Sequence, residues 1–278
     1  MLTQEQVQAY KRDGYLVIEN ILSDAEVELY RELTDSSSIS SLREELQEKD
    51  KEATVHMLGL TSMSSLFLDL ARHPAIVSRI QALLGPDIQL QHSKLATKPA
   101  AKGKGIFPWH QDYMFYPHTN TDILSVMIML DDATVENGCM QMVKGSHKLG
   151  PLDHTKDGYF TGACTESCYW EDERQVVNIM PRAGGISIHH GLTLHGSGPN
   201  LSGHSRRGIV FSYRADDAYQ LADGVWSDTG VLISGQRHER VRCDAGVVRL
   251  PRTLRYPGYP FGHAWNQEGD MAKQDREC

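Results

Sequence analysis

The sequence predicts a mainly β protein of the α+β class, a β-sandwich or jelly roll preceded by helices. Helix-capping signals are concentrated in residues 1–86, whereas residues 87–215 contain short apolar runs separated by Gly, Pro and Asn turns. Short strands at short spacing with such turns are typical of sandwiches and jelly rolls. Residues 216–278 are rich in Gly, Pro and Tyr and show no periodicity. We therefore expect one domain over residues 1–278, with a helical N-terminal support (1–86), a jelly-roll core (87–215) and a C-terminal wrap or lid (216–278).

The N-terminal part carries the start signals of two helices. A Ser or Thr followed three residues later by Glu or Gln can form a capping box at a helix N-terminus, and this pattern occurs at Thr3-x-x-Gln6 and Ser23-x-x-Glu26. Pro74 lies where it would break or kink a later helix. The expected elements are a helix ending near residue 13, strand 15–18, a helix from residue 23, strand 53–60 and the interrupted helix 64–84.

The jelly-roll part is predicted from six apolar runs. The run 123–130 is almost unbroken, which suits a strand covered on both faces. Alternation along the run 87–97 puts Lys94 on one face with four other residues, Ile88, Leu90, His92 and Ala96. A lysine on such a face either borders a cavity that holds an anion or lies at an edge with its stem on apolar surface. The long polar stretch 150–174 has the character of a functional or mobile loop. The expected strands are 87–97, 123–130, 139–143, 175–180, 186–190 and 206–214.

Composition limits the class of partner. A net charge of −8 and a pI near 5.9 argue against nucleic acid as the main partner. No apolar run approaches the ~18 residues of a membrane span, and the polar, acidic N-terminus is unlike a signal peptide. Five cysteines without a paired CxxC framework fit free thiols in a reducing compartment. We expect a cytoplasmic protein, monomeric or homodimeric, whose partner is a small molecule.

The stretch Pro108-Trp109-His110-Gln111-Asp112 carries the first sign of chemistry. Residues i and i+2 of a strand point to the same face, so His110 and Asp112 would present an imidazole and a carboxylate to one point. These are two of the three ligands of the facial two-histidine, one-carboxylate set that suits non-haem Fe(II). The pair alone is a weak signal, because it also occurs by chance at the exposed end of a strand.

A third ligand must come from the segment with His189, His190 and His195. The Gly-Ser-Gly-Pro-Asn turn that follows His195 places this histidine near a strand end, where a ligand pocket can form. Eleven residues later, Arg206 begins another strand. A guanidinium inside a β-sandwich needs a partner, and the carboxylate of a bound small molecule would serve. The alternative is a surface charge beside Arg207.

Several motifs in this order resemble those of one family. They are Trp-His-Gln-Asp at 109–112, Glu-Asn-Gly-Cys-Met-Gln-Met-Val-Lys-Gly-Ser-His at 136–147, and His-Gly-Ser-Gly-Pro-Asn at 195–200 followed by Arg206. Together with the N-terminal stretch 13–19, they closely resemble the phytanoyl-CoA dioxygenase family of Fe(II)- and 2-oxoglutarate-dependent oxygenases. The resemblance covers roughly residues 5–215.

The resemblance implies a fold and a metal site. The fold would be a double-stranded β-helix, cupin-like, with N-terminal helices packed on one sheet. The Fe(II) ligands would be His110, Asp112 and His195, with O₂ as a reactant and Arg206 as the anchor of the distal 2-oxoglutarate carboxylate. Because the aspartate is present, halogenation is not expected.

Further cosubstrate contacts follow from the same resemblance. By this resemblance, Ser197 would be a second hydrogen-bonding partner of the distal carboxylate. Lys94 and His56 fall near positions where the family contacts the cosubstrate. Ile128 stands where the family's phytanoyl enzyme has a tryptophan in the cosubstrate pocket.

Spacing also separates the candidate histidines. If His190 were the third ligand, the residue eleven positions later would be Leu201, which cannot bind a carboxylate. His195 with Arg206 meets both requirements. We therefore expect His189 and His190 to be structural or to support the ligands.

The implied activity is hydroxylation of an unactivated C–H bond of a small organic metabolite, such as an intermediate of secondary metabolism, with release of succinate and CO₂. Tyr113, Phe115, Tyr116 and Trp170 either line the substrate pocket or pack loops onto the core. Desaturation, epoxidation or rearrangement on the same iron is an alternative outcome. A non-catalytic, metal-binding jelly roll is a rival from another class.

Overall fold

The computed structural model describes residues 1–49, 55–100, 102–166, 175–222, 227–244, 246, 247 and 250. Both predicted capping boxes are confirmed, with Thr3 and Ser23 as N-caps that each receive the N3 backbone N–H. Pro74 begins a helix of its own rather than kinking a longer one, since proline fits the first turn. The helices are α1 (Gln4–Asp13), α2 (Asp24–Thr34), α3 (Ser37–Lys49), α4 (Leu60–Met63), α5 (Ser65–Ala71) and α6 (Pro74–Leu84), with the 3-10 helices η1 (Asp112–Phe115) and η2 (Ser146–Leu149).

The strands of the described chain form two antiparallel sheets and a small hairpin. The larger sheet has the order β1-β10-β5-β12-β3-β13, with β2 also paired to β3, and the smaller has the order β4-β11-β6-β9. The strands are β1 (Tyr15–Ile18), β2 (Val55–Leu58), β3 (Ile88–Lys98), β4 (Phe107–His110), β5 (Ile123–Met129), β6 (Met140–Val143), β7 (Thr155–Lys156), β8 (Tyr159–Phe160), β9 (Val176–Ile179), β10 (Ile186–His190), β11 (His195–Ser197), β12 (Arg206–Ala215) and β13 (Leu232–Ser234).

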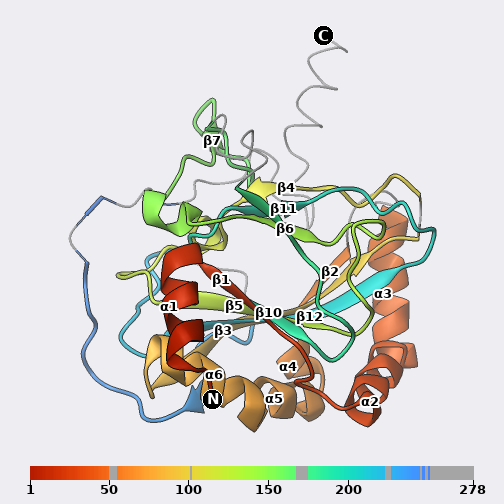
Figure 1. Ribbon diagram of the computed structural model, residues 1–278, viewed down its shortest axis with the longest axis horizontal. Coiled ribbons are helices and arrows are strands. Elements are labelled where there is room, and N and C mark those ends of the chain that lie inside the picture. Colours follow the sequence, from red (N-terminus) through yellow and green to blue (C-terminus); the bar gives the residue numbers. More distant parts are fainter. Residues whose placement is uncertain are drawn as a thin grey trace.

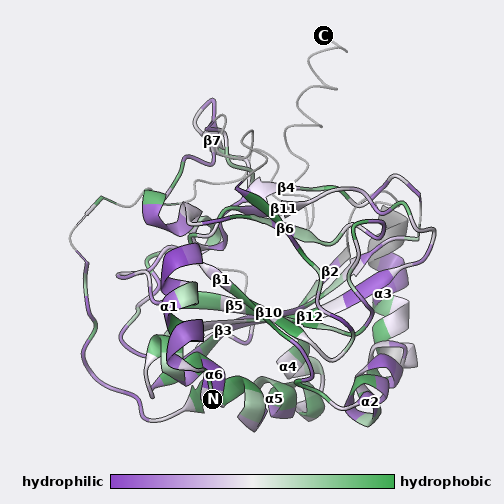
Figure 2. Ribbon diagram, viewed as in Figure 1, coloured by the Kyte–Doolittle hydropathy of each residue, from purple (hydrophilic) through white to green (hydrophobic). Residues whose placement is uncertain are grey.

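The two sheets face each other, and helices cover one of them. Figure 1 shows α2, α4, α5 and α6 on the side of the larger sheet that points away from the smaller sheet. Hydrophobic residues follow the larger sheet and α5 beneath it, whereas α1 is mostly hydrophilic (Figure 2). The main core lies between this sheet and the helices and includes Phe67, Leu70, Ile76, Ile80, Val126, Ile128, Ile209 and Phe211. The jelly-roll fold with N-terminal helices on one sheet is confirmed.

A β-bulge in β3 changes which side chains face the interior between the sheets. His92 pairs with Ser212, and Leu90 pairs with Tyr213, so Gln91 has no partner on β12. Such an extra residue reverses the alternation of side chains along the strand. Ile88 and Leu90 therefore pack in the core on the helical side, whereas Lys94, Ala96 and Lys98 line a cavity between the sheets. The expectation that Ile88 and Leu90 share a face with Lys94 is wrong.

The two long stretches without predicted structure contribute short strands to the described part of the chain. The stretch 150–174 contains the hairpin β7–β8, and its residues 167–174 lie outside the described residues. In the C-terminal part, β13 pairs with β3, and Arg242 forms ion pairs with Asp122, Asp217 and Asp244. No helix in the described part of the chain combines the length and apolar character needed to cross a membrane.

Candidate metal centre

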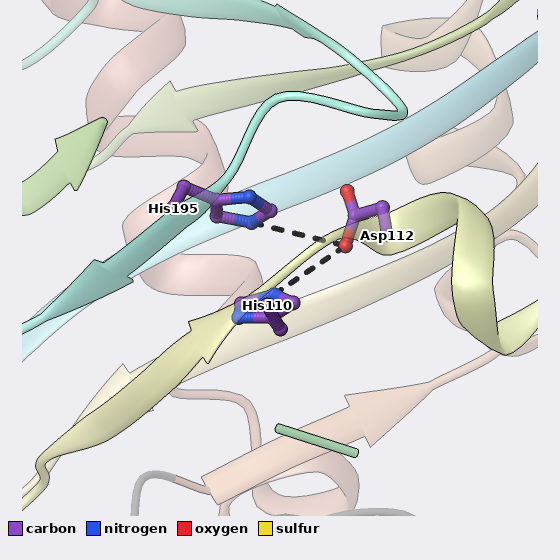
Figure 3. A group of neighbouring side chains, drawn as sticks. All are labelled: His110, Asp112 and His195. Carbon is purple, nitrogen blue, oxygen red and sulfur yellow. Dashed lines mark ion pairs between the residues drawn. The ribbon is translucent and has the colours of Figure 1, made fainter. Parts of the chain in front are cut away.

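His110, Asp112 and His195 come together between the two sheets (Figure 3). His110 ends β4 and His195 begins β11, and the two residues are partners in the register of the smaller sheet. Asp112 Oδ1 lies 3.6 Å from His110 Nε2 and 3.8 Å from His195 Nε2. One potential ligand atom from each residue lies within 4.8 Å of the others, and all three residues are buried. This is the arrangement of a facial metal-binding triad.

The strand that presents the pair is shorter than expected. β4 stops at His110, and Asp112 is the first residue of η1. Gln111 between them is still extended, with φ −115° and ψ 126°, so Asp112 points to the same side as His110. The Gln111 side chain faces elsewhere and donates to the carbonyls of Gly150 and Leu192. It thus holds two loops against the end of the strand.

The two histidines are oriented through their backbones. His110 Nδ1 lies 2.8 Å from the Pro108 carbonyl, and His195 Nδ1 lies 2.9 Å from the Thr193 carbonyl. A carbonyl oxygen only accepts, so each Nδ1 carries the proton and each Nε2 presents its lone pair to the cluster. Burial lowers the pKa of both imidazoles, that of His195 well below its usual range. Neutral imidazoles of this tautomer are ready to bind a metal.

Asp112 is held by residues of the larger sheet. Ser125 Oγ donates to Asp112 Oδ2 over 2.6 Å, and His189 Nε2 lies 3.1 Å from the same oxygen. Burial by itself would raise the pKa of Asp112, but the neighbouring imidazoles of His110 and His189 and the charge of Lys94 hold that pKa well below its usual range. The carboxylate is therefore ionised, with Oδ1 directed at the triad. His189 therefore supports Asp112, which is one of the two roles, structural or supporting, expected for it from the sequence.

The triad borders a cavity whose empty space, together with its opening to solvent, is about 540 Å³. Its charged lining consists of three cations, Lys94, Lys98 and Arg206, and one carboxylate, Asp112. The other lining residues are His56, Ala96, Phe107, His110, Met127, Met140, His189, His195, Gly196, Ser197 and Val210. Basic side chains thus outnumber acidic ones in the lining, which favours an anionic ligand.

Arg206 provides a test of whether this cavity fits 2-oxoglutarate. Only 5% of Arg206 is exposed, and its Nε has no hydrogen-bond partner among the described residues. Burial lowers its pKa to about 10, so the guanidinium remains charged. A buried cation without hydrogen bonds is costly, and a bound carboxylate would satisfy it. The residues present therefore fit the cosubstrate.

Most of the predicted cosubstrate residues border the cavity. Ser197, Lys94 and His56 are in its lining, and the His56 ring stacks on Phe107 at a centroid distance of 5.0 Å. Ile128 is an exception, because it packs in the core on the helical side. Its neighbour Met127 lines the cavity instead. In a strand that is apolar on both faces, the sequence does not reveal which face is which.

The predicted substrate residues lie mainly beside the cavity. Tyr113, Phe115 and Tyr116 are buried in an apolar cluster with Phe160, and none of the three is in the cavity lining that the described residues form. Phe115 packs edge-on against Phe160 at a centroid distance of 4.9 Å. This agrees with the alternative that they pack loops onto the core. Trp170 lies outside the described residues.

Residues that sequence reasoning missed include Ser125 and Lys98. Ser125 interrupts the apolar run of β5, and a single small polar residue there was the available signal. Lys98 was missed because the predicted strand ended at residue 97, whereas β3 continues to Lys98 and keeps it on the face of Lys94.

Known proteins share this sequence pattern and fold. The chain is 34% identical to a protein of Stutzerimonas stutzeri named probable alpha-ketoglutarate-dependent hypophosphite dioxygenase, over 93% of this chain and 94% of that protein. It is 27% identical to an ectoine dioxygenase of Bordetella parapertussis, over 77% of this chain and 76% of that enzyme. The crystal structure of the non-heme alpha ketoglutarate dependent carbocyclase SnoK from nogalamycin biosynthesis matches with a TM-score of 0.63 and 25% identity, over 84% of this chain and 94% of that chain.

The family assignment follows from these matches and from the geometry. The sequence model described as phytanoyl-CoA dioxygenase matches residues 10–208, a range that includes all three triad residues and Arg206. The resemblance noted from the motifs is therefore confirmed. The chain belongs to the phytanoyl-CoA dioxygenase family and is a 2-oxoglutarate-dependent dioxygenase, an enzyme that uses Fe(II), 2-oxoglutarate and O₂.

Proposed function

We propose that His110, Asp112 and His195 hold Fe(II), and that Arg206 with Ser197 holds the distal carboxylate of 2-oxoglutarate. Two neutral imidazole nitrogens and one ionised carboxylate are the donor set that non-haem Fe(II) prefers. The buried guanidinium of Arg206, whose Nε lacks a partner in the described chain, is the single observation that best supports the cosubstrate site. When bound, Fe(II) and 2-oxoglutarate activate dioxygen, so that one oxygen atom enters the substrate and the cosubstrate leaves as succinate and CO₂.

For the substrate, we propose hydroxylation of an unactivated C–H bond in a small organic metabolite. The cavity beside the triad has to accommodate 2-oxoglutarate as well, which favours a small molecule. Lys94 and His56, at the border of the cavity, are proposed to contact the cosubstrate or the substrate. Tyr113 and Tyr116 are buried in a separate apolar cluster, so they do not argue for an aromatic substrate pocket. The solved structure of a carbocyclase supports an outcome other than hydroxylation, such as desaturation, epoxidation or rearrangement, as an alternative on the same metal.

A second candidate is oxidation of a small phosphorus oxyanion at a P–H bond. It is supported by the relative named for hypophosphite, which matches nearly the full length of this chain. The cationic lining of the cavity, three cations against one carboxylate, also suits an anionic substrate beside the dianionic cosubstrate.

The experiment is a succinate-release assay with Fe(II), ascorbate and 2-oxoglutarate. Substrates would be hypophosphite, ectoine and a panel of small amino acids and hydroxy acids, with product masses recorded. We expect substrate-dependent succinate, and a mass gain of one oxygen atom in the product. Release with hypophosphite alone would favour the phosphorus candidate, and a product without added oxygen would favour rearrangement or desaturation.

Three variants, one of them a control, decide whether the proposed residues carry the activity. His195→Ala should abolish iron-dependent succinate release, whereas His190→Ala, a histidine of the same segment outside the triad, should retain it. Arg206→Ala should raise the 2-oxoglutarate requirement far more than the iron requirement. If the iron-loaded protein neither binds nor turns over 2-oxoglutarate, and His195→Ala changes nothing, the proposed function is wrong and a non-catalytic metal-binding role is favoured.

A further inference from the structure

Lys98 lies with Arg206 in the wall of the cavity and belongs to none of the motifs of the resemblance. The last residue of β3, it pairs with Arg206 in the register with β12. Only 2% of Lys98 is exposed, and both residues line the cavity with Ser197. Two buried cations thus lie together on the wall that carries the proposed anchor of the distal carboxylate.

The hydrogen bonds of Lys98 leave one donor unused. Its ammonium group donates to the Gly198 carbonyl over 2.7 Å and to the Gly105 carbonyl. An ammonium has three N–H donors, so the third has no partner among the described residues. The two carbonyls belong to the segments before β4 and after β11 and fix the position of Nζ. A third donor held there is available to an anion in the cavity.

The charges around Lys98 also lack a counter-ion. No carboxylate of the described chain lies within ion-pair distance of Lys98 or Arg206; Asp131, which pairs with Arg207, acts on the charge of Arg206 only from farther away. The titratable groups that face Lys98 are Arg206 from β12 and the Cys139 thiol from the turn before β6. Burial raises the pKa of Cys139, so this thiol stays neutral and supplies no charge. Two buried like charges without an anion are unfavourable, and one carboxylate between them would relieve both.

We propose that Lys98 binds the distal carboxylate of 2-oxoglutarate together with Arg206, and that it takes up a proton when the cosubstrate enters. This inference rests on the proposed function, because it adds a residue to the same cosubstrate site. A pair of cations at this end discriminates a dicarboxylate from a 2-oxo acid with an apolar end more strongly than one arginine does.

The proton uptake follows from the surroundings of Lys98. Burial, and next the charge of Arg206, lower its pKa to about 7. A bound carboxylate stabilises the charged form and raises this pKa again. Above pH 7 the free protein therefore has to bind a proton with the ligand. The affinity for 2-oxoglutarate falls as pH rises, by up to about tenfold per pH unit, until the pH reaches the raised pKa of the complex.

The test is calorimetric titration of the Zn(II)-loaded protein between pH 6 and pH 9 with two ligands. One is 2-oxoglutarate, and the other is 2-oxopentanoate, which carries a methyl group in place of the distal carboxylate. Buffers of different ionisation enthalpy count the protons taken up. The wild type should take up about one proton with 2-oxoglutarate at pH 8 and none with 2-oxopentanoate.

Lys98→Met removes the charge and keeps the length of the side chain. It should bind 2-oxoglutarate about 10- to 100-fold more weakly at pH 6, the loss of one charged hydrogen bond, with no proton uptake and unchanged 2-oxopentanoate affinity. Asn200→Ala is the matched control. Asn200 holds the same loop through the Pro99 and His204 carbonyls, so its variant loosens the loop and leaves the charge in place.

The outcomes distinguish a failure of the role of Lys98 from a failure of the cosubstrate site as a whole. If Lys98→Met keeps the wild-type proton count and the wild-type preference for 2-oxoglutarate, or if Asn200→Ala shows the same selective loss, Lys98 only ties loops together and the inference is wrong. If the wild-type protein itself does not bind 2-oxoglutarate, the proposed function fails instead.

Discussion

The two oxygens of Asp112 have different partners. Oδ1 faces the two histidines of the triad, whereas Oδ2 receives a hydrogen bond from Ser125 and contacts His189. Residues that orient a metal ligand in this way commonly contribute 10- to 100-fold to metal affinity. The direction of the carboxylate is thus set by strands of the opposite sheet.

Ser125→Ala should weaken Fe(II) binding by roughly tenfold, because Asp112 loses a donor and can rotate. The measurement is a metal-competition titration with a chromophoric chelator, alongside urea unfolding. Ser187→Ala is the matched control, since Ser187 is also buried in the larger sheet and its hydroxyl has no hydrogen-bond partner among the described residues. Equal loss of affinity in both variants would contradict the positioning role of Ser125.

At the scale of elements, the bulge at Gln91 lets one strand serve two environments. Before the bulge, Leu90 faces the helical core, and after it Lys94 and Lys98 face the cavity. Without the extra residue, the side chains before Gln91 or those after it would point to the opposite face of the sheet. The bulge is thus the feature that brings the lysines of β3 to the site while the first part of the strand supports the fold.

Deletion of Gln91 should lower the free energy of unfolding by at least about 4 kcal/mol, because Ile88 and Leu90 would both leave the core. The midpoint of urea unfolding, followed by circular dichroism, measures this. Gln91→Ala keeps the chain length and removes only the contacts of the side chain with His118 and Gln220, so it should cost far less. A deletion variant as stable as Gln91→Ala would show that the strand slips without penalty.

At the scale of the whole molecule, the triad joins the two sheets. His110 and His195 belong to the smaller sheet, and Asp112 is tied to Ser125 and His189 of the larger one. A metal ion that binds all three residues therefore links both layers of the jelly roll. Such binding stabilises only the folded chain, since the unfolded chain has no preformed site.

Metal loading should raise the thermal midpoint of unfolding. At a free metal concentration 100 times the dissociation constant, the gain is about 2.7 kcal/mol, or roughly 5–10 °C for a protein of this size. Scanning calorimetry with Fe(II) under anaerobic conditions, or with Mn(II), and again after EDTA, measures the shift. His195→Ala should show no shift, and an equal shift in that variant would place the metal elsewhere.

The predictable part of the fold and the site rests on local signals. Capping boxes, apolar runs and turns depend on neighbouring residues, so the sequence alone indicated the helices, most strand positions and the jelly-roll class. The same holds for His110 and Asp112, whose spacing is local, and for His195 and Arg206, which the motifs identify.

Only the tertiary structure decided how faces and distant residues meet. The bulge that redirects Lys94 depends on the pairing of β3 with β12, which no local pattern reveals. The choice of Met127 over Ile128 for the cavity is likewise hidden, because β5 is apolar on both faces. The contacts of Asp112 with Ser125 and His189 come from packing one sheet on the other. The sequence by itself therefore determined which chemistry this protein carries, because ligand types and spacing are written locally. The orientation and charge of the site were decided by the register of strands far apart in the chain.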